Sequence, residues 1–253
     1  MSKKDKEEVK TRAIQSNYLE DELKNYIKED TEKGKIDLFY NEYYVAKKTK
    51  CVKGKKPKIR IDDFVAKQLL NIDIKKLYSE NIKKYTRENY NIKRNETLKE
   101  LYKKEKLKEV EFAKIIFDKN LEIEDLGKII HYQTPIRETD NDKGVGDIDL
   151  LAYNEDGEYF TLIELKLLKN KDTMLHCILQ IYTYFSQINE AKLKSDFGKS
   201  NANNTRKAVL IFENSKHHKD YIKSNNYLQK LTEILEIDIY IIDNIKNINI
   251  TKL

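Results

Sequence analysis

The chain has 253 residues, of which 39% are hydrophobic and 36% are charged, with a net charge of +6 at pH 7. No apolar stretch approaches the roughly 20 residues that a membrane-spanning helix needs. The first ten residues are charged and lack the apolar core of a signal peptide. Cys51 and Cys177 are too far apart to suggest a zinc motif or a disulfide framework. We therefore expect no membrane attachment, free thiols and a cytoplasmic location.

The charge is unevenly spread along the chain. Residues 1–110 hold 30 Lys and Arg against 20 Asp and Glu, whereas residues 111–253 hold 19 against 23. A basic segment favours a nucleic-acid partner, because lysines displace counterions from phosphates. A general bias of the composition towards Lys, Asn, Ile and Tyr is the alternative explanation. We predict a basic, mainly helical extension at residues 1–104 that contacts nucleic acid, and a second domain at residues 105–253.

The first half of the chain is dominated by helical patterns. Apolar residues recur at near-helical spacing between residues 14 and 26. An aromatic run followed by a lysine-rich turn predicts a hairpin within residues 36–60, in which the aromatic side chains either stack on bases or fill a small core. Helical patterns return after Asp62. The apolar stripe between Thr97 and Asp118 predicts a helix there.

The second half alternates strands and helices. The expected elements, in chain order, are strands at 129–136, 147–153 and 159–167, a helix at 172–188 that is N-capped by Asp172 or Thr173, a polar loop at 195–206, a strand at 207–212, a helix at 217–235 and a strand at 237–242. The turn at 154–157 makes the second and third strands a hairpin. The later strand–helix–strand succession predicts parallel pairing. The fold class is therefore α/β, with a mixed sheet flanked by helices.

Three charged residues stand out within the expected hairpin. Gly146-Asp-Ile-Asp149 begins its first strand, and Ile163-Glu-Leu-Lys166 ends its second. Alternate residues of a strand share one face, so Glu164 and Lys166 lie on the same side of their strand. If the two strands pair, Asp149, Glu164 and Lys166 meet at one place on the sheet.

A divalent cation explains why such charges occur in apolar strands. Two partly buried carboxylates repel each other, which raises one pKa unless a cation is present. Mg²⁺ commonly takes one or two carboxylates together with other oxygen ligands. We therefore expect Asp149, Glu164 and the backbone carbonyl of Leu165 to hold Mg²⁺ or Mn²⁺. Lys166 then lies beside the attacking water, which it activates or positions.

These residues resemble a known nuclease family. Gly146-Asp-Ile-Asp-Leu-Leu-Ala-Tyr153, Leu162-Ile-Glu-Leu-Lys166 and Gln180-Ile-Tyr-Thr-Tyr184 are similar to motifs of the PD-(D/E)xK superfamily, particularly its RecB-like and NucS-like branches. The resemblance covers about residues 105–245, although Ile148 stands where the family name has proline. It implies a restriction-endonuclease-like core and metal-dependent hydrolysis of phosphodiester bonds, usually in DNA.

The resemblance also assigns roles to residues outside the hairpin. It makes Gln180 part of the catalytic set, and it places Gln180 and Tyr184 on one helical face where they contact the substrate backbone. An upstream helical glutamate of the family corresponds to Glu109 or Glu111. Lys169 and Arg206 are further candidates for binding substrate, although Arg206 also suits an ordinary flexible loop.

Other interpretations remain open at this point. The domain can be a catalytically inactive module that binds nucleic acid or a protein partner, or the three charges can form a surface ion-pair cluster. His217 and His218, at the start of an expected helix, are a weak metal signal and are expected to be exposed. A homodimer is left open.

Overall fold

The computed structural model describes residues 61–92, 98, 101–104, 106–139, 146–224, 226–245 and 248–253. The helix expected between residues 14 and 26 and the hairpin expected within residues 36–60 lie outside these ranges. Among the described residues, none of the helices combines the length and the apolar character that crossing a membrane requires.

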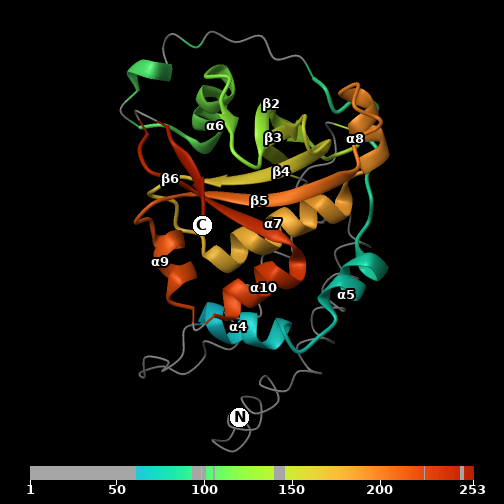
Figure 1. Ribbon diagram of the computed structural model, residues 1–253. Coiled ribbons are helices and arrows are strands. Elements are labelled where there is room, and N and C mark those ends of the chain that lie inside the picture. The colour runs from blue at the N-terminus through green and yellow to red at the C-terminus, as the bar shows by residue number, and fades with distance from the viewer. Residues whose placement is uncertain are drawn as a thin grey trace, which may run out of the picture.

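A seven-stranded mixed sheet forms the centre of the protein (Figure 1). Its strands lie side by side in chain order: β1 (Glu122–Ile123), β2 (Gly127–Pro135), β3 (Asp147–Asn154), β4 (Tyr159–Lys166), β5 (Asn204–Phe212), β6 (Ile237–Ile242) and β7 (Ile250–Lys252). Strands β1 to β4 are antiparallel, β4, β5 and β6 are parallel, and β7 is antiparallel to β6. The expected hairpin of β3 and β4 and the expected parallel pairing of β5 and β6 are both confirmed.

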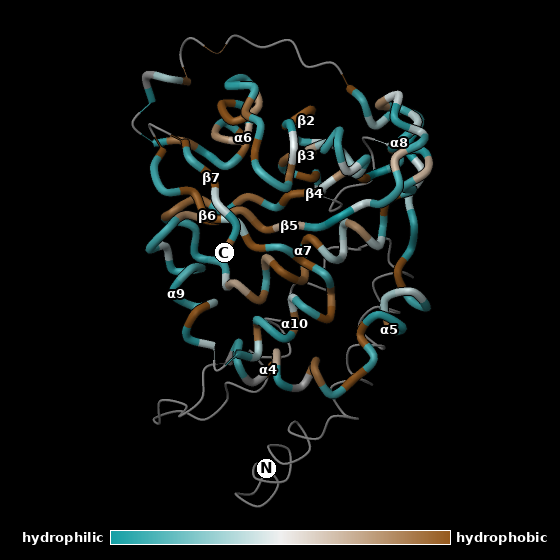
Figure 2. Tube along the Cα trace, in the orientation of Figure 1, coloured by the Kyte–Doolittle hydropathy of each residue, from teal (hydrophilic) through white to brown (hydrophobic). Residues whose placement is uncertain are grey.

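Helices cover both faces of this sheet. The elements are α4 (Ile61–Leu69), α5 (Ile74–Asn81), a 3₁₀ turn at Leu101–Lys103, α6 (Glu109–Asp118), α7 (Met174–Gln187), α8 (Glu190–Asp196), α9 (Lys216–Ile222) and α10 (Tyr227–Leu235). Helix α6 packs on one face, whereas α7 and α10 pack on the other (Figure 1). Hydrophobic residues concentrate on the strands and on the helix sides that face them (Figure 2). An α/β fold with a mixed sheet flanked by helices is therefore confirmed.

Strand β4 is the most deeply buried element of the sheet. All eight of its residues are buried. A strand that is covered on both faces needs apolar residues at successive positions, because neither side chain direction leads to water. Apart from Thr161, the sequence Tyr-Phe-Thr-Leu-Ile-Glu-Leu-Lys meets this requirement until Glu164 and Lys166. The side chains of Glu164 and Lys166 are therefore charged groups in an environment that otherwise favours apolar side chains.

The helix expected between Thr97 and Asp118 is wrong for the described residues of its first half, which are 98, 101–104 and 106–108. The regular helix begins only at Glu109, after a short 3₁₀ turn. The backbone N–H of Lys108 donates to the carboxylate of Glu111 at 2.9 Å. A helix begins where a side chain satisfies the N–H groups that lack an intrahelical partner, and Glu111 does so here.

The helix expected at 217–235 is divided into α9 and α10. The hydroxyl of Ser224 donates to the carbonyl of Tyr221 at 3.0 Å and accepts from the N–H of Leu228 at 3.3 Å. Asn226 adopts a left-handed backbone with φ of 66°. Serine and asparagine offer such local alternatives to helical hydrogen bonding, so they end one helix and begin the next.

Helices α4 and α5 share the core of the residues that follow them. Leu69 and Tyr78 belong to the same buried cluster as residues of α7 and α10. The hydroxyl of Tyr78 hydrogen-bonds that of Thr183 at 3.2 Å, and the N–H of Tyr85 donates to the carbonyl of Gln187 at 2.7 Å. The division into residues 1–104 and 105–253 stays a prediction, and the shared core makes it testable.

We expect Leu69→Ala to destabilise the whole sheet. Removing a fully buried leucine side chain costs about 2–5 kcal/mol. Because Leu69 is 1% exposed and packs into the shared core, amides in β4 and β5 should exchange hydrogen faster by the corresponding factor. The control is Ile222→Ala, at a residue that is 54% exposed. Unchanged protection of β4 and β5 in Leu69→Ala would indicate that residues 61–104 fold independently.

Candidate functional site

Strands β3 and β4 bring the three predicted residues together. The β3–β4 ladder pairs Leu150 with Ile163, so Asp149 and Glu164 follow at the end of this ladder. Lys166 lies two residues further along β4, on the same face as Glu164. Exposure is 8% for Asp149, 1% for Glu164 and 4% for Lys166. The structure thus gathers two carboxylates and one ammonium group at one buried place.

Both oxygens of Asp149 accept hydrogen bonds. Its Oδ1 accepts from Nε2 of Gln133, and its Oδ2 accepts from the backbone N–H of Leu165, each at 2.8 Å. The carboxylate therefore bridges a side chain from β2 and the backbone of β4. Two donors from neighbouring strands fix its orientation.

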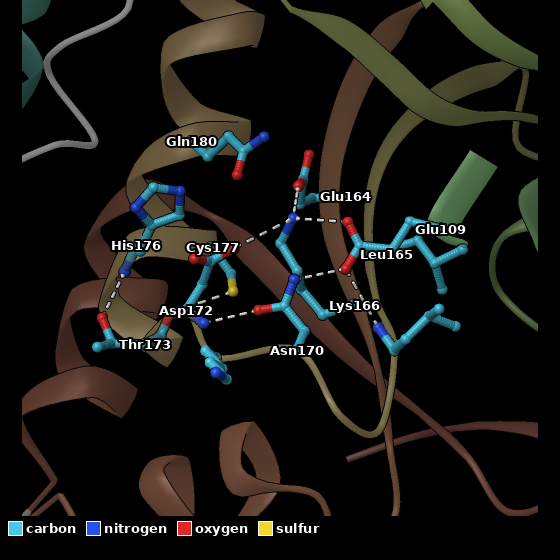
Figure 3. A network of polar contacts seen from close by, with 12 residues as sticks. Glu109, Glu164, Leu165, Lys166, Asn170, Asp172, Thr173, His176, Cys177 and Gln180 are labelled. Atoms are coloured by element: carbon cyan, nitrogen blue, oxygen red, sulfur yellow. Dashed lines mark hydrogen bonds and ion pairs between the residues drawn. The ribbon is translucent and has the colours of Figure 1, made fainter. Parts of the chain in front are cut away.

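Lys166 is surrounded by acidic side chains (Figure 3). Its Nζ lies 2.6 Å from Oε1 of Glu164, 3.3 Å from Oε2 of Glu109 and 3.9 Å from Oδ2 of Asp172. With Asp149, four carboxylates share one nearby lysine. If all four are ionised, the cluster keeps a net negative charge even after the lysine is counted.

The pKa values reflect this excess of acidic groups. Burial raises the pKa of Asp149 to about 6, although the charge of Lys166 works in the opposite direction. Burial also holds the pKa of Glu164 well above its usual range, and the charge of Asp149 adds to that rise. For Lys166, burial opposes the charged form, but Glu164 and the other acidic neighbours outweigh it and raise the pKa. Lys166 therefore stays protonated.

Two buried oxygens at the site have no hydrogen-bond partner within the described part of the chain. They are Oε2 of Glu164 and Oε1 of Gln180. Carboxylate and amide oxygens of this kind suit a hard divalent cation, which needs one or two carboxylates together with carbonyl or water oxygens. The described residues contain no group of three or more His, Cys, Asp or Glu side chains that could hold a metal. The oxygen donors of Asp149, Glu164 and Gln180 are of the kind that Mg²⁺ or Mn²⁺ takes, in contrast to the nitrogen and sulfur ligands of a structural zinc site.

Helix α7 borders this cluster. Its N-cap is Thr173, whose side chain accepts from the N–H of His176 at 3.2 Å, so one of the two expected N-caps is confirmed. Nε2 of Gln180 donates to the hydroxyl of Tyr184 at 2.9 Å. A Cβ atom at Gly146 would lie 2.0 Å from that hydroxyl. Only glycine at the entry to β3 leaves Tyr184 this position.

The two basic candidates lie far apart. Lys169 follows the end of β4, whereas Arg206 is in β5, beside the first half of β4. Lys169 is exposed in the loop that follows Lys166. Arg206 pairs with Thr161 on the β4–β5 ladder, five positions before Lys166, or roughly 16 Å along the strand. Its guanidinium stacks on the ring of Tyr159 at 3.5 Å. The structure therefore brings Lys169 near the site and does not bring Arg206 there.

The expectation that His217 is exposed is wrong. Its side chain is fully buried, and neither ring nitrogen has a hydrogen-bond partner among the described residues. Burial, together with the charges of Lys166 and Lys216, lowers its pKa to about 4. The packing of α9 against α7 and β5 buries this ring. His217 is therefore neutral and lies within electrostatic reach of Lys166.

Several residues of the cluster are not evident from the sequence. Glu109 and Glu111 were equal candidates, and only Glu109 contacts Lys166, because Glu111 binds Lys104 at 2.7 Å. Asn170 donates to Oε1 of Glu109 at 2.6 Å and so fixes that carboxylate. Gln133, whose amide orients Asp149, does not belong to any of the sequence motifs. Strand β2 also contains Lys128, His131 and Thr134, so its polarity does not single out Gln133.

Comparison with known proteins adds no assignment: no family model matches the chain, and no significant match is found among curated proteins or solved structures.

We expect the stability of the metal-free protein to depend on pH through Asp149. Its folded-state pKa of about 6 lies above the ordinary value near 3.9, so the stabilising effect is complete below about pH 4 and is lost as the pH rises through 6. Relative to Asp149→Asn, the wild type should lose about 3 kcal/mol of unfolding free energy between pH 4 and 8. Urea unfolding in EDTA at a series of pH values measures this.

Glu155→Gln is the control with the opposite sign. The hydrogen bond from Lys199 lowers the pKa of Glu155, so the wild type should gain slightly over this variant as the pH rises. Parallel curves for the wild type and Asp149→Asn would show that Asp149 has an ordinary pKa.

Proposed function

We propose that the protein is a metal-dependent nuclease that hydrolyses phosphodiester bonds, with DNA as the favoured substrate. The observation that carries this proposal is the buried convergence of Asp149, Glu164 and Lys166 with an excess of negative charge. The choice of the PD-(D/E)xK superfamily, its restriction-endonuclease-like core and DNA as substrate rests on the sequence motifs.

The residues of the site have two proposed roles, which are binding the cation and positioning the water. Asp149 and Glu164 supply hard oxygen ligands, and the carbonyl of Leu165 is the expected third. A bound Mg²⁺ or Mn²⁺ supplies Lewis-acid polarisation of the phosphate and a more acidic water. Lys166 keeps its proton because the acidic groups around it raise its pKa. We therefore favour Lys166 as a group that positions the water and stabilises negative charge on the phosphate, rather than as a base.

Basic side chains beside the cluster suit a phosphate backbone. Lys169, Lys171 and Lys216 are exposed. Nζ of Lys216 donates to the carbonyls of Lys171 and Asp172 at 2.9 and 3.0 Å, which attaches the start of α9 to the β4–α7 loop. Lysines around an acidic centre attract the phosphates of a nucleic acid while the centre itself keeps its cation. Gln180 and Tyr184 are the further proposed substrate contacts.

A surface ion-pair cluster explains these observations less well. Ion pairs at a surface are solvated and have a median value of about 0–1 kcal/mol. Here the side chains of Glu164 and Lys166 are 1% and 5% exposed, and one oxygen of Glu164 is left without a protein partner among the described residues. A cluster that served packing alone would be replaced by apolar side chains at little cost.

We expect Mg²⁺ to stabilise the wild type against thermal unfolding. Saturation at a hundred times the dissociation constant adds about 2.7 kcal/mol, because only the folded state binds. Asp149→Asn and Glu164→Gln should lose this response. In EDTA above pH 6, Asp149→Asn should be more stable than the wild type, because burial disfavours the charged form of Asp149. Differential scanning calorimetry with and without Mg²⁺ measures both effects. A Mg²⁺ response that survives in both variants would place the cation elsewhere.

We expect the wild type to cut nucleic acid only when Mg²⁺ or Mn²⁺ is present. Glu164→Gln and Lys166→Ala should each reduce the cleavage rate roughly 100-fold or more, since each removes a group that acts at the reacting phosphate. Labelled single-stranded, double-stranded and branched DNA, together with RNA, identify the substrate.

Glu124→Gln and Lys119→Ala are the matched controls for these substitutions, because both residues are exposed and lie away from the cluster. Folded wild type that binds Mg²⁺ but cuts none of the substrates would favour the inactive binding module.

A further inference from the structure

Strand β2 contains an unusual backbone conformation beside the site. Gln133 has φ of 49°. Seven described residues other than glycine have positive φ; the other six, all in turns or at helix ends, are Asn120, Asp125, Glu158, Asn214, Asn226 and Glu236. A left-handed residue with a side chain costs about 1–2 kcal/mol. Gln133 carries this cost inside a strand, where regular pairing needs extended backbone.

The strand is irregular shortly before Gln133. The pairing of β2 with β3 shifts register between Ile129 and His131. The burial pattern then loses its alternation, because every residue from His131 to Pro135 is buried. Irregularities of this kind re-aim side chains and are common next to active sites.

The side chain of Gln133 is directed at Asp149. Its Nε2 donates to Oδ1 at 2.8 Å, opposite the hydrogen bond that Oδ2 accepts from Leu165. Each carboxylate oxygen can accept two hydrogen bonds or ligands. The two donors therefore fix the plane of the carboxylate and leave acceptor capacity on both oxygens.

We propose that Gln133 is a positioning residue that holds the carboxylate of Asp149 in the orientation in which it binds the divalent cation. This inference rests on the proposed function. The strained backbone at Gln133 is retained because it brings the amide to Asp149, in agreement with the general finding that backbone strain collects at functional sites. Groups that orient a metal ligand without touching the metal typically change its affinity 10–100-fold when they are replaced.

A purely structural role makes a different forecast. If Gln133 only satisfies a buried carboxylate, its replacement lowers stability and leaves cation affinity unchanged in the folded fraction. Gln133→Gly separates the two roles, because glycine adopts positive φ without strain and also removes the amide. Glu158→Gly is its matched control, since Glu158 has the same φ of 49° and lies in an exposed turn.

The test measures Mn²⁺ binding to the purified full chain by electron paramagnetic resonance of the free ion, alongside urea unfolding in EDTA. We expect Gln133→Gly to bind Mn²⁺ 10–100-fold more weakly than the wild type and Glu158→Gly to bind it equally well. Gln133→Met, which keeps the length and the backbone strain but lacks the donor, should show the same loss. It also serves as the second variant if Gln133→Gly fails to fold.

Two results would overturn the inference, and they are distinguishable. Wild-type affinity in folded Gln133→Gly or Gln133→Met would reject positioning by Gln133 while leaving the proposed function intact. Failure of the wild type itself to bind Mn²⁺ would reject the cation site, and with it both the proposed function and this inference.

Discussion

The arrangement of the site follows from one imbalance of charge. A single buried lysine, Lys166, lies among carboxylates that outnumber it, and two of them, Asp149 and Glu164, are themselves buried. Burying an ion costs several kcal/mol unless close partners replace water. The metal-free protein meets this cost partly by raising the pKa values of Asp149 and Glu164. A divalent cation would remove the imbalance without protonation, which is why the fold and the proposed chemistry agree.

Apolar packing around the sheet fixes the positions of these charged side chains. Apolar clusters lie on both faces of the sheet, and β4 contributes to both of them, with Leu162 on one face and Ile163 and Leu165 on the other. A close-packed interior resists the small movements that would change the spacing of these side chains. The packing on both faces of β4 therefore helps to hold Glu164 and Lys166 in place.

Much of the site could be predicted from sequence, because it depends on strand alternation. Two strands joined by a short turn must pair, and alternate residues then share a face, so Asp149, Glu164 and Lys166 could be placed together. The choice between Glu109 and Glu111 could not be made, since it depends on where α6 begins. Once the helix starts at Glu109, Glu111 is engaged by Lys108 and Lys104, and Glu109 remains to contact Lys166.

Other features depend on tertiary packing that no local pattern records. A histidine in the first turn of a helix is usually exposed, but α9 packs against α7 and β5, so His217 is buried. The left-handed backbone of Gln133 follows a register shift between Ile129 and His131, and such shifts are set by how the strands pair. The periodicity of β2 alone could not reveal it, because the sequence pattern of a regular strand and of an irregular one differ by a single position.

The local violations of folding rules in this protein cluster at one place. Three such features are neighbours. Gln133 has a left-handed backbone inside β2, and the carboxylate of Asp149 in β3 accepts a backbone N–H of β4 in place of a carbonyl. Glu164 and Lys166 form an ion pair within the buried strand β4. Sequences that specify one structure are usually consistent at every level, and the exceptions concentrate at functional sites. A protein selected for stability alone would lose these features, since each is replaceable by an apolar or unstrained alternative. Their coincidence on three adjacent strands therefore argues for selected chemistry at Asp149, Glu164 and Lys166 more strongly than any one of them does alone.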